Sequence, residues 1–326
     1  VPNVSAKWYA DGTLNASYNC IDRHLASKAD KVALIWEPDD PDEASLAITY
    51  QELHDNVCRA ANAMKELGVS KGDVVTIYMP MVPEALYAMQ ACSRIGAIHS
   101  VVFGGFASNE LATRIKDCRP KAILTASCGL EPGRIVAYQK LIEGALALAP
   151  DIVESVLVFK REEAPWDLKS GRDHDWDEAL AAAAPADCVP VEATDPLYIL
   201  YTSGTTGQPK GVVRDNGGHM VALKWSMKHI YDVDPGEVYW AASDVGWVVG
   251  HSYIVYGPLL HGCTTLMFEG VPNYPNFSRF WEVIDKHKVN IFYTAPTAIR
   301  ALMREGDKPV KKTSRKSLKL LGTVGE

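Results

Sequence analysis

Strand-sized and helix-sized apolar segments alternate along almost the whole length of the 326 residues. Short runs rich in β-branched residues, such as 73–79 and 121–126, are typical of buried strands. Longer amphipathic segments lie between such runs, and 49–67 begins with a capping box formed by Thr49 and Glu52. This alternation predicts an α/β fold in which two mostly parallel sheets are covered by helices.

The pattern also predicts how the chain is organised. The expected strands are 32–36, 73–79, 97–102, 121–126, 197–201, 238–242, 264–268, 289–293 and 318–322. The expected helices are 49–67, 83–95, 109–118, 217–231, 252–260, 278–287 and 297–304. An acidic, polar stretch lies in the middle and is interpreted as an exposed connection. The expected parts are therefore a first α/β subdomain (1–160), a polar connection (161–195) and a second α/β subdomain (196–326).

Composition excludes several classes of partner. A net charge of −7 gives no reason to expect binding to nucleic acid or to an anionic membrane. No apolar stretch reaches the roughly 20 residues of a membrane-spanning helix. The seven cysteines are scattered without a C-x-x-C pair, which argues against a zinc site or a disulfide framework. Single cysteines of this kind favour a reducing, cytoplasmic compartment.

The segment that follows the expected strand 197–201 has the composition of a loop that binds polyphosphate. It reads Thr202-Ser203-Gly204-Thr205-Thr206-Gly207-Gln208-Pro209-Lys210-Gly211. Glycines let the backbone approach a ligand, hydroxyl and N–H groups donate hydrogen bonds to phosphate oxygens, and lysine adds charge. The common G-x-x-x-x-G-K-[ST] loop does not fit, because Pro209 stands where its second glycine would be. The alternative is a solvated turn without a ligand.

Four segments carry a family resemblance. Residues 202–211 resemble the phosphate-binding signature of the adenylate-forming enzymes, which include acyl-CoA synthetases, luciferases and peptide-synthetase adenylation domains. Residues 244–253, 293–300 and 324–326 resemble the short-chain branch, which contains AMP-forming acetyl-CoA and propionyl-CoA synthetases. The resemblance implies that residues 1–326 are an incomplete N-terminal domain, and that the mobile C-terminal domain of the family is absent.

The resemblance implies a ligase that joins a small carboxylic acid to AMP and then to coenzyme A. It implies catalytic roles for Thr202 and Lys210. The ATP-binding residues that it implies are Thr202, Ser203, Gly204, Thr205, Thr206, Gly207, Lys210, Gly325 and Glu326. Mg²⁺ would accompany ATP, although no residue of this chain is expected to bind a metal.

Two further sites follow from the same resemblance. The acyl pocket is expected to involve Trp247, Val248, Val249, His251 and Val324. Coenzyme A is expected to contact Phe103, Gly104, Gly105, Arg134, Val249 and Asn273. An acidic residue, Glu131, stands near a position where acetyl enzymes often carry a second arginine. The resemblance gives no indication of an oligomeric state.

The sequence leaves the acid open, with acetate first and propionate second. Segments 7–100 and 263–326 look more like acetyl-CoA synthetases, whereas segments 122–140 and 202–249 look more like propionyl-CoA synthetases. Glycolate or acrylate would also fit a small pocket. A different class of function is a binding module that holds a nucleotide or an acyl-adenylate without turnover. An amino-acid-activating domain should carry an aspartate in its pocket, and Asp244 lies too early in its motif for that.

Overall fold

The computed structural model describes residues 6–202 and 209–324, and two sheets dominate this part of the chain. The first sheet has seven strands, which in spatial order are β10 (Asp173–Asp175), β9 (Ser155–Phe159), β6 (Ala122–Ala126), β4 (Val74–Tyr78), β5 (Ile98–Val101), β12 (Pro196–Thr202) and β13 (Lys210–Asp215). All neighbouring strands are parallel except β12 and β13. The predicted α/β class with mostly parallel sheets is confirmed.

The second sheet has six strands. In spatial order they are β17 (Leu320–Thr323), β16 (Ile291–Thr294), β14 (Val238–Ala242), β15 (Thr264–Phe268), β2 (Val32–Glu37) and β3 (Leu46–Thr49). Only the β2–β3 pair is antiparallel. Two short ribbons complete the strands: β1 (Thr13–Leu14) pairs with β11 (Val191–Glu192), and β7 (Cys128–Glu131) pairs with β8 (Arg134–Ala137).

The two sheets exchange strands across the expected subdomain boundary. Strands β2 and β3 come from the first half of the chain but pair with β15 of the second half, with Leu34 opposite Thr265. Conversely, β12 and β13 follow the expected boundary but extend the first sheet, with Tyr198 opposite His99. The sheets therefore do not coincide with residues 1–160 and 196–326, because pairing between strands far apart in sequence decides their membership.

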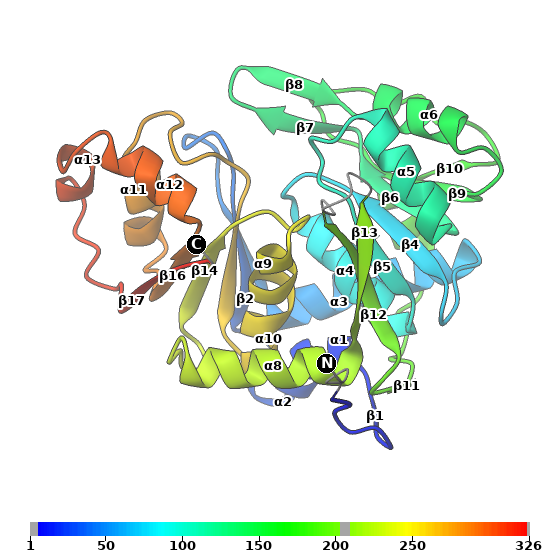
Figure 1. Ribbon diagram of the computed structural model, residues 1–326, viewed down its shortest axis with the longest axis horizontal. Helices are drawn as coiled ribbons and strands as arrows, with labels where there is room; N and C mark the ends of the chain where they lie inside the picture. Colours follow the sequence, from blue (N-terminus) through cyan, green and yellow to red (C-terminus); the bar gives the residue numbers. More distant parts are fainter. Residues whose placement is uncertain (1–5, 203–208, 325–326) are drawn as a thin grey trace, which may run out of the picture.

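Helices fill the space between the sheets and cover their outer faces (Figure 1). The helices are α1 (Ala16–Cys20), α2 (Asp22–Lys28), α3 (Tyr50–Glu66), α4 (Pro83–Ile95), α5 (Ser108–Cys118), α6 (Gln139–Leu148), α7 (Trp176–Ala182), α8 (Asn216–His229), α9 (Val248–Gly250), the π-helix η1 (His251–Tyr256), α10 (Gly257–His261), α11 (Arg279–Lys286), α12 (Pro296–Met303) and α13 (Lys308–Lys311). The largest core joins α3 and α4 to residues of both sheets. Helices α5 and α6 pack on the outer face of the first sheet, and α11 and α12 pack on that of the second.

Local signals set the ends of the two central helices. The hydroxyl of Thr49 accepts a hydrogen bond from the Glu52 amide, and the Glu52 carboxylate accepts one from the Thr49 amide, so the predicted capping box is confirmed. Helix α4 begins with Pro83 and ends before Gly96, whose φ of 73° is left-handed. Glycine adopts this conformation at little cost, so it stops the helix at the predicted residue.

The acidic stretch between the two halves is exposed at most of its acidic residues, such as Glu162, Asp167 and Asp177, but parts of it are built into the fold. Strand β10 joins the first sheet, and Trp176 at the start of α7 is buried. Asp175 is also buried, and its carboxylate accepts a hydrogen bond from the Glu178 amide and pairs with Lys160 at 2.6 Å. Side-chain and backbone partners thus replace the water that acidic composition would otherwise require.

Candidate active site

The loop predicted to bind phosphate connects two paired strands. Thr202 ends β12 and lies opposite Lys210, the first residue of β13, so the described ends of the loop are held together by the sheet. Strand β13 was not predicted, and it separates the loop from helix α8. Of the other predicted ATP-binding residues, Ser203, Gly204, Thr205, Thr206, Gly207, Gly325 and Glu326 lie outside the described residues. Thr202 and Lys210 are both exposed, as contact with a ligand requires.

The parallel strands of each sheet end at a common edge. In the first sheet, β12 runs parallel to β5, which leads into the turn at Phe103. In the second sheet, β14, β16 and β17 are parallel, and Ala242 lies opposite Thr294, which lies opposite Thr323. Segments that follow these strands therefore lie at the carboxyl edge of each sheet, which is where open α/β sheets bind ligands.

The two edges contact each other through aromatic residues. The ring centroids of Phe103 and Trp247 are 5.6 Å apart, and those of Phe106 and Trp247 are 6.3 Å apart. A Cβ atom on Gly246 would lie 3.0 Å from Phe103 Cα, so glycine permits this close approach. The structure thus brings the predicted coenzyme A turn against the predicted acyl segment.

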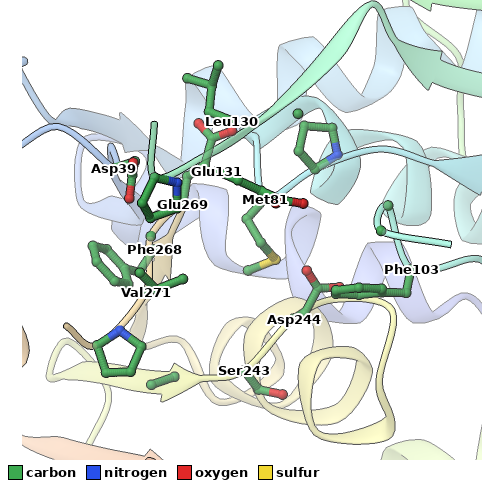
Figure 2. Close-up of a pocket in the computed structure, with 18 of the residues that line it drawn as sticks. Asp39, Met81, Phe103, Leu130, Glu131, Ser243, Asp244, Phe268, Glu269 and Val271 are labelled. Atoms are coloured by element: carbon green, nitrogen blue, oxygen red, sulfur yellow. The ribbon is translucent and has the colours of Figure 1, made fainter. Parts of the chain in front are cut away.

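A pocket of about 330 Å³ lies beside this contact (Figure 2). The turn contributes Phe103, Gly104 and Gly105, and the β7–β8 ribbon contributes Leu130 and Glu131. The second sheet contributes residues that follow β14 and β15, including Ser243, Asp244, Glu269 and Val271. The pocket therefore opens between the two sheets, and its volume lies in the range of small-molecule sites.

Two carboxyl groups in this pocket have raised pKa values. Burial raises the pKa of Asp244 to about 6, and this carboxylate accepts a hydrogen bond of 2.6 Å from the Gly246 amide, which acts in the opposite direction. Burial also raises the pKa of Glu269 to about 7, although Arg161 donates two hydrogen bonds to it at 2.5 and 3.1 Å. Burial thus makes both carboxyl groups weaker acids than free carboxyl groups.

The predicted acyl residues occupy different environments. Trp247 and Val248 are each 46% exposed, and Val249 is half-buried. His251 is fully buried behind this segment, where its Nδ1–H donates to the Trp247 carbonyl at 3.0 Å. Burial lowers the pKa of His251 to about 4, which keeps the ring neutral at physiological pH. Val324 lies at the end of β17, where its amide donates to the Thr294 carbonyl at 3.0 Å.

The remaining predicted coenzyme A contacts are exposed residues close in sequence to residues that line the pocket. Arg134 projects from the β7–β8 ribbon and donates to Glu131 at 2.6 Å, in an exposed ion pair. Asn273 is exposed and follows Pro272, which lines the pocket. Glu131 thus neutralises part of the charge that Arg134 would offer to a phosphate.

Sequence reasoning missed the β7–β8 ribbon and its support. Tyr138 follows the ribbon and is buried under Gly104 and Gly129, where added Cβ atoms would come within 2.3 and 2.4 Å of its hydroxyl oxygen. The turn residues Pro132 and Gly133, flanked by short runs of strand-forming residues, were the available signal for a hairpin. No local signal links Glu269 to Arg161, because they follow strands of different sheets.

Comparison with known proteins identifies the family. The family model described as AMP-binding enzyme matches residues 21–326. The chain belongs to this family. Over 99% of its length it is 60% identical to an acetyl-coenzyme A synthetase of Parvibaculum lavamentivorans, 59% to one of Beijerinckia indica and 56% to one of Syntrophobacter fumaroxidans. The chain spans about half (50%) of the length of each of these relatives.

The described residues show neither a metal-binding cluster nor a membrane-spanning helix. Residues 6–202 and 209–324 contain no group of three or more His, Cys, Asp or Glu side chains placed to hold a metal ion. None of the helices in this part of the chain has both the length and the apolar character needed to cross a bilayer.

Proposed function

We propose that this chain is the nucleotide- and acyl-binding part of an AMP-forming short-chain acyl-CoA synthetase whose acid is acetate. The observation that carries the proposal is the 56–60% identity to acetyl-coenzyme A synthetases over 99% of the chain. The geometry supports it independently, because the described ends of the loop and the Phe103–Trp247 contact lie at the carboxyl edges of the sheets. We further propose that the protein works in the cytoplasm.

The proposed reaction has two steps. A carboxylate oxygen of acetate attacks the α-phosphorus of ATP, and diphosphate leaves. The thiol of coenzyme A then attacks the acyl carbon, the bond to the AMP oxygen breaks, and the thiol proton is released. The first step depends on positioning and on neutralising phosphate charge rather than on a protein nucleophile.

Each part of the site has a proposed role. Thr202 and Lys210 would help to hold the phosphates of ATP, together with the loop residues Ser203, Gly204, Thr205, Thr206 and Gly207. Gly325 and Glu326 would lie near the adenine and the α-phosphate. Trp247, Val248, Val249 and Val324 would shape the acyl pocket, with His251 buried behind it. Mg²⁺ would arrive with ATP and neutralise phosphate charge, without an assigned ligand in this chain.

The pocket of about 330 Å³ is the proposed place of the coenzyme A arm. Phe103, Gly104 and Gly105 line the pocket and would contact the arm, together with Val249, Arg134 and Asn273. The pocket opens beside Trp247, so a thiol that enters it would approach the proposed acyl pocket. Propionate is the second candidate acid, because Val249 stands where acetyl-CoA synthetases usually have threonine.

ATP–diphosphate exchange tests the proposal. The chain is joined to the remaining half of the Parvibaculum relative and assayed with acetate, propionate, glycolate and an amino acid. Exchange that acetate stimulates most is the expected result. The Lys210→Gln variant should lower kcat/KM for exchange by ~10²-fold, while Lys308→Gln, on the distant helix α13, should change it little. Equal exchange without any acid, or exchange only with an amino acid, would overturn the proposal.

A further inference from the structure

A second pocket, of about 360 Å³, lies at the opposite end of β12 from the loop. It is bounded by β1, α1, α2, α8 and α10, which lie together at the bottom of Figure 1. Ala193, which lines it, precedes β12, whereas Thr202 ends that strand. A strand of this length spans roughly 20 Å, so the second pocket is separate from the candidate active site.

Two cations line this pocket without a carboxylate partner among the described residues. Arg23 Nη2 donates to the Leu260 carbonyl at 2.8 Å, and its Nη1 is 3.5 Å from the Asn19 amide oxygen. Lys224 Nζ donates to His261 Nδ1 at 3.1 Å. Neutral groups thus hold both side chains in place, while their positive charges stay uncompensated.

Further basic groups lie directly behind them. Lys28 donates to the Gly262 carbonyl at 2.8 Å, and the buried His24 has an Nε2 atom without a hydrogen-bond partner in the described part of the chain. Burial, with added repulsion from Arg23 and Lys28, lowers the pKa of His24 to about 4. Burial also lowers the pKa values of Lys28 and Lys224, and the charge of Arg23 adds to both shifts. The protein therefore maintains an excess of positive potential at one end of the pocket.

The rest of the lining is largely apolar. Leu14 of β1, Met220 and Val221 of α8 and Leu260 of α10 contribute apolar side chains. An inorganic ion would leave the apolar part of the lining in contact with water, and an uncharged hydrocarbon would leave the cations without a partner. A ligand with an anionic head and a short alkyl part would satisfy both ends.

We propose that this pocket binds a small amphiphilic anion, namely a phosphate monoester or a carboxylate with a short alkyl chain. Its head group lies between Arg23 and Lys224, and its alkyl part lies against Met220 and Leu260. Arg23 offers a planar fork of donors, which suits the oxygens of either head group. The proposal does not depend on the acyl-CoA synthetase reaction.

Isothermal titration calorimetry on this chain tests the proposal with hexyl phosphate, hexanoate and the uncharged hexanol. Hexyl phosphate should bind with a Kd of about 0.1–1 mM, and hexanol should bind at least tenfold more weakly. Stronger binding of hexanoate than of hexyl phosphate would assign a carboxylate as the head group, and the reverse would assign a phosphate. Absence of saturable binding by both anions would overturn the proposal.

Variants locate the binding. Arg23→Gln and Lys224→Gln should each lower the affinity for the anion by about tenfold, which is the effect of losing one charge-assisted hydrogen bond. Lys224→Arg, which keeps the charge, should retain most of the affinity and covers the case that a glutamine variant misfolds. Lys228→Gln is the matched control, because Lys228 lies one turn further along α8, outside the pocket and within 3.8 Å of Asp232 and Asp234. Affinity that survives in Arg23→Gln and Lys224→Gln but falls in Lys210→Gln would place the anion at the loop and overturn the proposal.

Discussion

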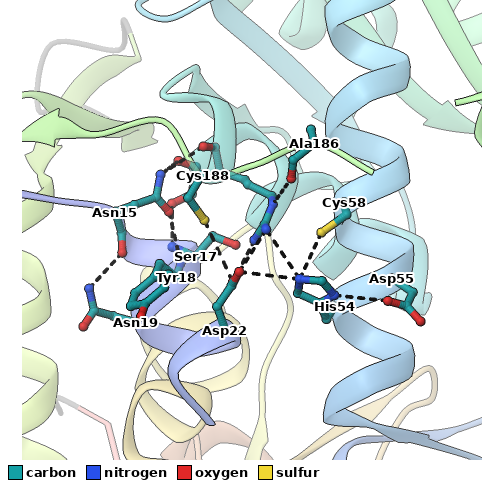
Figure 3. Close-up of polar contacts among 12 residues, drawn as sticks. Asn15, Ser17, Tyr18, Asn19, Asp22, His54, Asp55, Cys58, Ala186 and Cys188 are labelled. Carbon is teal, nitrogen blue, oxygen red and sulfur yellow. Dashed lines mark hydrogen bonds and ion pairs between the residues drawn. The ribbon is translucent and has the colours of Figure 1, made fainter. Parts of the chain in front are cut away.

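Asp22 and Arg23 are adjacent on α2, yet among the described residues only Asp22 has oppositely charged partners. Asp22 accepts hydrogen bonds from Arg94 at 2.7 and 2.9 Å and lies 3.5 Å from His54, in a network that Figure 3 shows. Arg23 lies among bases and has no acidic partner among the residues that the structure describes. The charge of Asp22 is therefore balanced by protein groups, whereas the charge of Arg23 can be balanced by solvent or by a ligand.

Burial explains why the network around Asp22 needs its partners. The Arg94 side chain is only 4% exposed and also donates to the Ala186 carbonyl at 2.6 Å. Burial alone would raise the pKa of Asp22, but hydrogen bonds with His54 and Arg94 outweigh it and hold the pKa well below its usual range. The network ties α2, α3 and α4 to the segment before β11. Charged groups that join elements in this way stabilise the fold only as a complete set.

The largest effect should follow from removing Asp22. The Asp22→Ala variant leaves the buried Arg94 guanidinium without its counter-charge, and we expect the free energy of unfolding to fall by about 3–5 kcal/mol. Urea denaturation monitored by circular dichroism measures the change. Asp30→Ala, at an exposed carboxylate just after α2, is the control and should stay within about 0.5 kcal/mol of the parent. Equal, small effects of both variants would mean that the network does not hold the helices together.

A medium effect should appear in the pH dependence of stability, where two histidines act in opposite directions. The hydrogen bond with Asp22 raises the pKa of His54 to about 10. Its contribution is therefore complete below the unfolded value near 6.5 and is lost as the pH rises toward 10. The pKa of His24 is lowered to about 4, mainly by burial, so the unfolded chain binds more protons between pH 6.5 and 4. Stability from this group is present above pH 6.5 and is lost as the pH falls through that window.

Urea midpoints of the parent, His54→Gln and His24→Gln between pH 4 and 10 measure the two contributions. The His54 variant should lose stability mainly below pH 8, so its difference from the parent shrinks as the pH rises. The difference between the His24 variant and the parent should instead change mainly below pH 6.5. If both variants change stability over the same pH range, the two histidines do not act in opposite directions.

Local chemistry allowed much of the fold to be predicted, but contacts between distant segments did not follow from it. Pro83 and Gly96 fixed both ends of α4, and β14 and β15 have the predicted bounds because each is a short apolar run. Strand β13 was missed, since an edge strand with exposed Val212 and Val213 carries no alternating pattern. Such signals describe a segment but do not name its partner.

The same limit applies to the candidate site. The residues at Phe103 and Trp247 were each predicted from their own motif, whereas their mutual contact depends on how the two sheets meet. The second pocket was not predicted at all, because Arg23 and Lys224 come from helices far apart in the chain. Charge balance likewise depends on the folded surroundings. The sequence around Asp22 and Arg23 does not show which of these two adjacent charges has an oppositely charged partner.

The smallest effect should follow from removing Lys224, and it completes the contrast with Asp22. Lys224 has only neutral and positive neighbours, so Lys224→Gln removes repulsion from Arg23 and leaves no buried charge unpaired. We expect the free energy of unfolding to stay within about 0.5 kcal/mol of the parent, or to rise slightly. Lys228→Gln loses two long, exposed contacts to Asp232 and Asp234 and should lower it by at most about 0.5 kcal/mol. A loss above about 1 kcal/mol in Lys224→Gln alone would mean that this lysine stabilises the fold as Asp22 does, and the excess of positive charge at the second pocket would then be structural.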